Sequence, residues 1–355
     1  MKCSLFTIND SGKKIMPVPL AYLIVVAIWS TTPLAIKWST DGAGFLFGVA
    51  SRMCLGVVLA LLLCAVFRIA LPLHHRARLT YLASGIGVFC AMTPAYWAAQ
   101  YIPSGWISVM YGMTPIFTSI IGTLFLGEKT VSVRKTGALV ISVAGLYTMF
   151  HRDAALDGHV LTSVCVVLLG TLCYAATMIA VKAIGAGLNS TATMTGTLVV
   201  TTVLFLAAWY IGGGVPDSIS FRAAGAIVYL GVVGSVLGFM LFYYVLQHVK
   251  ATQAALVTLI TPGGALLIGH HFNHEPLTGA IISGAALVLT GLLLFQFGDG
   301  TVRIRLTFRR ETAAGALPVA NTAVTGLSQQ DIDQVLQESD DGKQDLLQQP
   351  GGQKQ

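Results

Sequence analysis

Two tyrosine–glutamine pairs are the side chains of this sequence best suited to orienting a small polar solute. Tyr96 with Gln100, and Tyr243 with Gln247, are each four residues apart, which puts both members on one face of a helix. Aromatic and amide groups on one face suit an apolar pocket with a few orienting hydrogen bonds. Both tyrosines stand near the ends of apolar segments, where an aromatic belt at a membrane surface is the alternative. The further side chains that we expect in such a pocket are Trp29, Tyr111 and Tyr174.

Arg52, in the segment GVASRMCLG, is the main charge inside an apolar stretch. A guanidinium in such a stretch is costly unless it faces a cavity or finds partners. The long side chain can also bend back so that its charge reaches the surface. We predict that Arg52 contacts a solute or a gate, and the surface-reaching conformation is the alternative.

The sequence lacks the common signatures of catalysis. No G-x-S-x-G, H-E-x-x-H, Walker or paired-Asp pattern occurs, and His270, His271 and His274 of HHFNHE have the wrong order for a zinc protease. A metal site, pH sensing and a plain interfacial position all stay open for these histidines. The six cysteines form no C-x-x-C pair. We therefore expect no enzyme, no cofactor and no bound metal.

Composition indicates the kind of chain that carries these residues. Hydrophobic residues make up 55% of the 355 and charged residues only 10%, against roughly 25% charged residues in soluble domains. Residues 15–36 and 79–127 contain no charged side chain. Because about 20 apolar residues cross the hydrocarbon of a bilayer, the second stretch holds two crossings, separated by the turn YIPSG. The expected fold class is an all-α polytopic membrane protein.

Ten apolar segments are candidate membrane-spanning helices. Lys13 and Lys14 before the first of them resemble the start of a signal peptide, but the apolar region is too long and no A-x-A-like cleavage site follows. We therefore keep it as a membrane helix. The ten segments are 17–37, 45–67, 79–100, 104–126, 133–150, 160–182, 190–212, 222–247, 251–272 and 278–297.

Basic residues predict the orientation, since cytoplasmic loops are enriched in Lys and Arg. With a cytoplasmic N-terminus, the basic residues on the outside are Lys37, Arg152 and Arg222. This pattern favours ten spans in the cell (inner) membrane with both termini in the cytoplasm. The formal charge of +6 then reports topology rather than nucleic-acid binding. The residues on the inside are Lys2, Lys13, Lys14, Arg68, Arg76, Arg78, Lys129, Arg134, Lys135, Lys182, Lys250, Arg303, Arg305, Arg309 and Arg310.

One pattern occurs twice along the chain. TPIFTSIIGTLFLGE begins at Thr114, and TPGGALLIGHHFNHE begins at Thr261, with the same spacing of Thr, Pro, Gly, Phe and Glu. Five spans in each half would make the second half enter the membrane inverted relative to the first. Inverted repeats with a binding site at their interface recur in secondary transporters. The sequence therefore predicts ten helices arranged as two inverted five-helix repeats.

The repeated prolines, Pro115 and Pro262, stand inside their spans. A proline there frees a backbone carbonyl and bends the helix, which membrane helices tolerate when neighbours or water satisfy the carbonyl. We predict hinges at these two positions, and a static kink needed for packing is the alternative.

Four further charges stand near the ends of spans. Glu128 and Glu275 close the two copies of the repeat, and we predict that they fix loops or packing rather than carry protons. Lys37 and Lys182 are predicted to be anchors at the membrane surface.

The repeat also carries a resemblance to a known family. AAQYIPSGWISVMYG, followed by TPIFTSIIGTLFLGEKTVSVRKTGALVISVAGL, resembles the EamA family of the drug/metabolite transporter superfamily, and the second copy is similar. Arg52 matches an arginine that such proteins often carry. The resemblance covers residues 17–297 and implies a ten-helix transporter, commonly an exporter of small metabolites. The sequence departs from the family where LGE reads NHE at 273–275, and in its tail from residue 299.

These observations predict four parts: a cytoplasmic N-terminal segment, 1–16; two EamA-like repeats, 17–150 and 160–297; and a cytoplasmic, largely disordered tail, 298–355. The expected function is secondary transport by alternating access, with export of a small metabolite or an amino-acid-like solute. A membrane-embedded enzyme and a passive channel or scaffold are the alternatives. We expect a small-molecule substrate and the lipid bilayer as partners, no nucleic acid, and leave a homodimer open.

Overall fold

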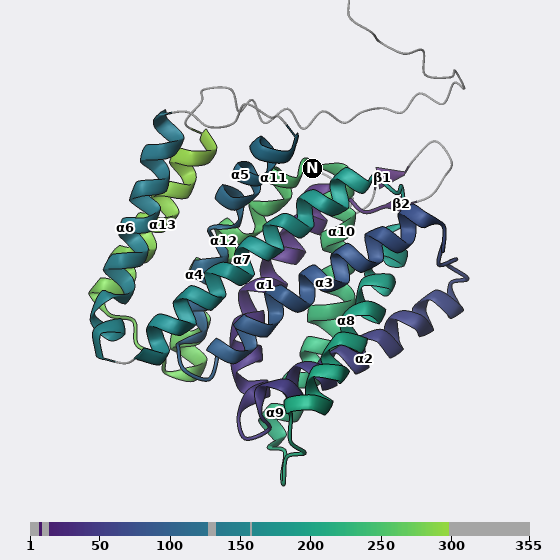
Figure 1. The fold of residues 1–355 in the computed structure, drawn as a ribbon, viewed down its shortest axis with the longest axis horizontal. Helices are drawn as coiled ribbons and strands as arrows, with labels where there is room; N and C mark the ends of the chain where they lie inside the picture. Colours follow the sequence, from purple (N-terminus) through teal and green to yellow (C-terminus); the bar gives the residue numbers. More distant parts are fainter. Residues whose placement is uncertain (1–6, 9–13, 127–132, 157, 298–355) are drawn as a thin grey trace, which may run out of the picture. The chain divides into compact units, whose positions relative to one another are not determined.

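Helices make up almost all of the chain that the structure describes (Figure 1). This structure, a computed structural model, describes residues 7–8, 14–126, 133–156 and 158–297. The described elements belong to one unit, Met1–Arg303, and the second unit, Ile304–Gln355, lies outside the described residues. The tail expected at 298–355 and the predicted loop-fixing residue Glu128 therefore also lie outside them.

The first half of the chain contains a short hairpin and six helices. The two-residue strands β1 (Thr7–Ile8) and β2 (Lys14–Ile15) pair antiparallel. The helices are α1 (Val18–Thr40), α2 (Phe45–Val66), α3 (His75–Ala98), α4 (Ser104–Tyr111), α5 (Thr114–Leu126) and α6 (Val133–Leu156).

The described part of the second half, residues 158–297, contains seven α-helices and one π-helical segment. They are α7 (Gly158–Ile184), α8 (Ser190–Gly212), α9 (Phe221–Tyr229), the π-helix η1 (Leu230–Leu237), α10 (Gly238–His248), α11 (Ala251–Ala255), α12 (Val257–Asn273) and α13 (Gly279–Phe297). The segments α9, η1 and α10 follow one another without a gap and correspond to the predicted span 222–247.

Within the described residues, eight helical stretches are long and apolar enough to cross a bilayer. The expected all-helical, multi-pass class is thereby confirmed. The other two predicted spans, 133–150 and 278–297, correspond to α6 and α13, of which α13 is apolar but shorter over its described part. The eight stretches are Val18–Thr40, Phe45–Val66, His75–Ala98, Ser104–Leu124, Gly158–Ile184, Ser190–Gly212, Phe221–His248 and Gln253–Asn273.

Several helices begin where the sequence supplies a capping group. Asn189 accepts a hydrogen bond from the amide of Thr191 at the start of α8, and Ser220 accepts one from Ala223 at the start of α9. Such caps satisfy amides that have no partner within the helix. Gly44, just before α2, has a φ of 77°, a left-handed conformation that a side chain would strain. Polar and glycine residues at the connections therefore set where the long apolar helices begin.

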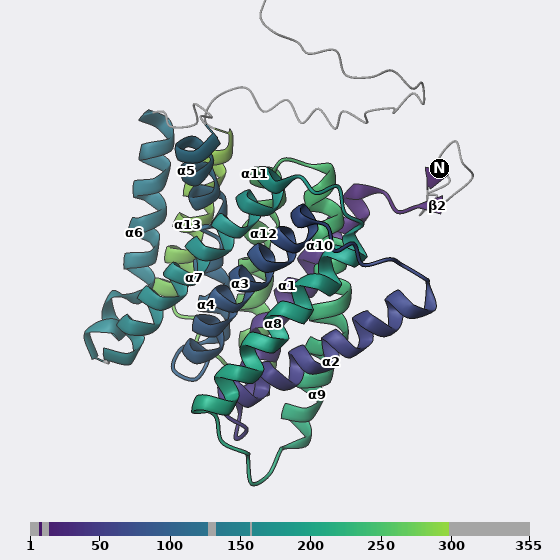
Figure 2. The ribbon, with the colours of Figure 1, turned by 45° about the vertical axis from the view of Figure 1, so that its right-hand side comes forward.

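Helices from the two halves pack against each other throughout the described unit. α1 packs on α10 and α12, while α7 packs on α3 and α5, and α2 packs on α8 (Figure 2). α6 and α13 lie side by side at one edge (Figure 1). Gly145 and Gly284 meet there so closely that a Cβ on either would come within 2.6 Å of the other's carbonyl oxygen. Small residues allow this close approach between membrane helices.

Glu275 fastens the start of α4 to the end of α12. Its carboxylate accepts hydrogen bonds from the Ser104 amide (3.0 Å) and the Ser104 hydroxyl (2.9 Å), and a longer one from the Gly105 amide (3.4 Å). The Asn273 side chain also donates to it, at 3.1 Å. A negative charge is favoured at a helix N-terminus, where amides lack partners. Glu275 is buried, so its role in packing agrees with the prediction.

Lys37 and Lys182 bind helix ends of the opposite kind. The Lys37 ammonium donates to the carbonyls of Ala99 (3.2 Å) and Ile102 (2.8 Å), just after α3. The Lys182 ammonium donates to the Leu246 carbonyl (2.6 Å) in the last turn of α10. A cation is favoured at a helix C-terminus, where carbonyls lack partners. Both lysines are therefore fastened to protein backbone rather than only anchored at a membrane surface.

We expect Glu275→Ala to destabilise the protein because it strands buried amides at the start of α4. The loss should be about 1–3 kcal/mol for each amide left without an acceptor. Glu275→Gln should lose less, since its amide oxygen can still accept. The apparent melting temperature of the full chain, purified in detergent, measures the effect.

Asp41→Asn is the matched control for this prediction. Asp41 forms an ion pair with Arg222 in which both side chains are more than half exposed, so its loss should cost less than about 1 kcal/mol. A melting temperature that falls as far in Asp41→Asn as in Glu275→Ala would contradict the capping role.

Candidate functional site

A cavity of about 90 Å³ lies between helices from both halves of the chain. It is bounded by α1, α2, α3 and α4 from the first half and by α7, α10 and α12 from the second. Most of its wall is apolar. The aromatic, hydroxyl-bearing and charged residues of the wall are Trp29, Thr32, Arg52, Ser108, Tyr111, Tyr174, Phe239, Thr258 and Thr261.

Arg52 reaches this cavity and is only 1% exposed. Its Nε donates to the Ser235 hydroxyl (2.8 Å), and its Nη1 donates to the Tyr96 hydroxyl (3.3 Å) and lies 3.8 Å from the Met92 sulfur. These partners come from η1 and α3. The side chain is thus turned into the protein and held there, which differs from the surface-reaching alternative.

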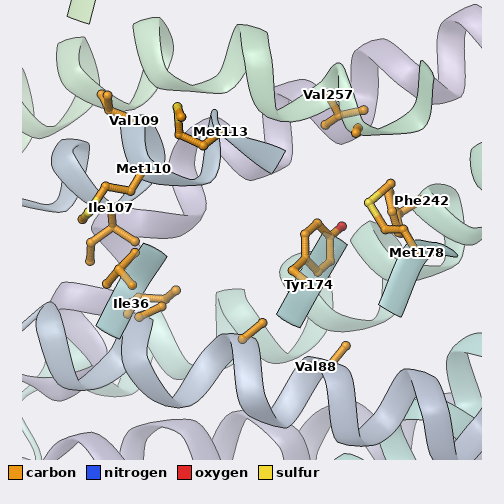
Figure 3. Close-up of a cluster of buried hydrophobic side chains, with 14 of the residues drawn as sticks. Ile36, Val88, Ile107, Val109, Met110, Met113, Tyr174, Met178, Phe242 and Val257 are labelled. Atoms are coloured by element: carbon orange, nitrogen blue, oxygen red, sulfur yellow. The ribbon is translucent and has the colours of Figure 1, made fainter. Parts of the chain in front are cut away.

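Aromatic rings form one wall of the cavity. The Tyr174 ring stands edge-on to both Trp29 and Tyr111, with ring centroids 6.1 Å apart in each case. Phe242 packs against Trp29 at 4.9 Å. Figure 3 shows Tyr174 between Ile107 and Met110 on one side and Met178 and Phe242 on the other. Offset and edge-on rings of this kind give a rigid apolar surface.

The Tyr174 hydroxyl is buried and has no hydrogen-bond partner among the described residues. The Tyr111 hydroxyl, in contrast, donates to the Ala91 carbonyl at 2.6 Å. A buried polar group without a partner is unusual and calls for a water or a ligand. Tyr174 is therefore the tyrosine of this wall with free capacity to bind a solute.

Tyr96 and Tyr243 are both fully turned into the protein. Tyr96 accepts the hydrogen bond from Arg52, next to the cavity. Tyr243 accepts a hydrogen bond from Thr197 (3.2 Å), whose hydroxyl also bonds Ser84 (2.6 Å). Tyr243 borders a smaller void of about 10 Å³ that shares Tyr174 with the larger cavity. Neither tyrosine lies in an aromatic belt at the edge of its helix.

Gln100 and Gln247 lie away from the cavity, and both are exposed. α3 ends at Ala98, so Gln100 falls beyond the helix and no longer shares a face with Tyr96; it donates to the Trp97 carbonyl. Gln247 donates instead to the Leu188 carbonyl at 2.7 Å. The prediction that each glutamine lines a pocket together with its tyrosine is therefore wrong, because Tyr96 and Tyr243 are buried and both glutamine side chains are exposed.

The two repeated prolines lie in different local structures. Pro115 is in the first turn of α5, directly after the break between α4 and α5 at 112–113. Pro262 lies inside α12, whose only nearby interruption separates it from α11 at Leu256. Both prolines are buried. The repeated Thr-Pro motif thus follows an interrupted helix in both halves. The interruption lies directly before the Thr-Pro pair of Pro115, but about two helical turns before Pro262.

The π-helix η1 supplies contacts that no motif in the sequence marks. Ser235 of η1 binds Arg52, and a Cβ on Gly234 would come within 3.2 Å of the Arg52 Nη2. A Cβ on Gly238 would come within 3.3 Å of the Trp29 indole nitrogen. π-helical turns are rare in proteins. Where they do occur, they are often found at functional sites. The glycines Gly231, Gly234 and Gly238 are the feature of the sequence that marks this segment. Their spacing indicates close packing of helices rather than a polar contact.

The histidines of HHFNHE make local contacts at the end of α12. His270 binds the Glu275 backbone carbonyl through Nδ1 (2.9 Å), and His274 ends the helix with a φ of 49°. His271 packs edge-on to Phe272. Within the described residues, no group of three or more His, Cys, Asp or Glu side chains is arranged to hold a metal.

Comparison with known proteins finds similar transporters in bacteria. The chain is 26% identical over 286 residues to the uncharacterized transporter YoaV of Bacillus subtilis (strain 168), which covers 79% of this chain and 97% of YoaV. It is 22% identical over 283 residues to a probable terminal-alkyne amino-acid exporter of Streptantibioticus cattleyicolor, covering 78% and 92% of the two chains.

The fold and the two halves each have a counterpart among known proteins. A protein of solved crystal structure aligns with 78% of this chain and 96% of its own, with a TM-score of 0.59 at 14% identity, so it shares the fold. The EamA-like transporter family matches twice, at residues 16–150 and 161–297. The chain, with its multiple membrane-spanning helices, belongs to the EamA-like transporter family.

Proposed function

We propose that this transporter is a secondary transporter that exports a small metabolite or an amino-acid-like solute by alternating access. The observation that carries the proposal is the central cavity, which takes its walls from both halves and contains a buried arginine and a rigid aromatic wall. Binding at the interface of two repeats recurs in transporters that work by alternating access. The name of the amino-acid exporter from Streptantibioticus cattleyicolor agrees with the direction and the solute class.

The proposed binding residues are Arg52, Trp29, Tyr111 and Tyr174 in the cavity, with Tyr96 and Tyr243 behind them. Gln100 and Gln247 are left out of the proposed site because both are exposed and bind backbone carbonyls elsewhere.

The repeats are proposed to be inverted, with ten spans in all. The main pairings between helices of the two halves have counterparts with the halves exchanged. α1, the first helix of the first half, packs on α10 and α12 of the second half. α7, the first helix of the second half, packs on α3 and α5 of the first half. The lysine contacts also repeat in the two halves. Lys37 binds the carbonyl of Ala99 in the first half, and Lys182 binds the carbonyl of Leu246 in the second, where Leu246 lies 147 residues after Ala99. α6 and α13, the last helices of the two halves, pack on each other. A two-fold axis in the membrane plane would produce all three observations.

Flux into proteoliposomes that contain the purified full chain tests the function. Saturable flux of small amino-acid-like or carboxylate solutes, well above that of empty liposomes, is the expected result. Flux that rises linearly with concentration would indicate a channel, and formation of a new compound from the solute would indicate an enzyme. Either outcome would overturn the proposal.

The orientation is proposed from the basic residues, with both termini in the cytoplasm and the chain in the cell (inner) membrane. Reporter fusions after Gly298 should then report a cytoplasmic position, and fusions within 212–217 an external one. An external position for the fusion after Gly298 would be incompatible with ten spans and with the inverted repeat.

Pro115 and Pro262 are proposed to be hinges that open opposite sides of the cavity. Pro115→Ala and Pro262→Ala should therefore shift the access of a cavity residue toward opposite membrane faces. The measurement is labelling of a single cysteine at Ser108 or Thr258, in a chain without its native cysteines, by reagents applied from each side. Both positions line the cavity.

Pro94→Ala is the matched control, because Pro94 lies inside α3 but outside the repeated motif. It should leave the sidedness of labelling unchanged. Unchanged labelling and flux in both Pro115→Ala and Pro262→Ala would make these prolines static packing features.

A further inference from the structure

We propose that the transported solute carries a carboxylate, and that this carboxylate docks on the guanidinium of Arg52. The inference rests on the proposed function, because it names the substrate class of the same cavity.

The guanidinium keeps donor capacity that the protein does not use. A guanidinium has five N–H donors. Nε is taken by Ser235, and Nη1 has Tyr96 and Met92 nearby. Nη2 makes no hydrogen bond to any described residue, and it packs against Gly234, where a Cβ would come within 3.2 Å of it. A carboxylate oxygen can accept a charge-assisted hydrogen bond from Nη2, so this unused donor suits it.

The charge of Arg52 is also uncompensated in the described part of the chain. Its hydrogen-bond partners are a serine, a tyrosine and a methionine, all uncharged. The carboxylates whose burial the structure describes lie beyond helix ends: Asp41 follows α1, Asp217 lies between α8 and α9, and Glu275 follows α12. A buried charge without a counter-ion is costly, and a bound anion would supply the missing partner.

The rest of the cavity limits the body of the solute. Trp29, Tyr111 and Tyr174 present aromatic surface, and Ser108, Thr258 and Thr261 present hydroxyls. At about 90 Å³, the cavity has room for a small solute. The expected solute is therefore a carboxylate with a short, mainly apolar body. An amino acid and a plain carboxylic acid share this chemistry.

Matched sets of compounds separate the carboxylate from the rest of the solute. One set is L-alanine, propionate and L-alaninamide, and the second is L-valine, 3-methylbutanoate and L-valinamide. Thermal stabilisation of the detergent-purified full chain gives the concentration of each compound needed for half of its effect. We expect carboxylates to act at concentrations about tenfold or more below those of their amides. If an amino acid and its plain acid stabilise the protein at the same concentration, the protein does not bind the ammonium group. If the amino acid acts at a lower concentration, the protein binds the ammonium group as well as the carboxylate.

Arg52→Gln should bring acids and amides to about equal effect. Arg222→Gln is the matched control, since it also removes an arginine charge, but from an exposed ion pair with Asp41. It should keep the preference of the wild type. If Arg52→Gln does not fold, the ratio of the half-effect concentrations of acid and amide in the wild type still tests whether the site prefers a carboxylate.

Two results would overturn the inference: no preference for carboxylates in either set, or a preference that survives in Arg52→Gln. Parallel flux in proteoliposomes separates this failure from failure of the proposed function. Saturable flux of an amide as readily as of its acid keeps the transporter and overturns carboxylate docking. A carboxylate preference that depends on Arg52, without saturable flux, overturns transport alone.

Discussion

Backbone groups exposed by interrupted helices must find partners, because lipid offers no hydrogen bonds. In this protein charged side chains supply several of them. Glu275 accepts from the amides at the start of α4, while Lys37 and Lys182 donate to carbonyls at the ends of α3 and α10. Each contact holds a helix end that would otherwise be unsatisfied, and the arrangement of helices around the cavity depends on them.

Arg52 differs from these charges in what it binds. Its hydrogen bonds go to the side chains of Ser235 and Tyr96, and no helix end is among its partners. It is also the charge that reaches the cavity wall. A buried charge that holds no backbone together is expensive to keep, so its place beside an aromatic cavity points to a ligand. This contrast separates Arg52, for which we propose a binding role, from Lys37, Lys182 and Glu275, which bind helix ends.

Irregular helix geometry gathers around the same cavity. α4 and α5 are interrupted at 112–113, α11 and α12 at Leu256, and η1 lies between α9 and α10. Ser108 and Tyr111 of α4, and Thr258 of α12, line the cavity beside these interruptions. Non-helical backbone inside a membrane is tolerated where protein or a water-filled cavity satisfies it.

Sequence alone determined the all-helical, multi-pass class and the family, because long apolar segments and a doubled motif leave few alternatives in a membrane. It also singled out Arg52, since a charge in an apolar stretch needs an explanation. Only the tertiary structure decided which neighbours these residues have. α3 ends before Gln100, so the amide left the face of Tyr96, and the π-helix brought Ser235 to Arg52 across 183 positions of sequence. Glu275 likewise met Ser104 only because α4 and α12 pack together. Such contacts depend on where helices end and cross, which periodicity along one segment does not encode.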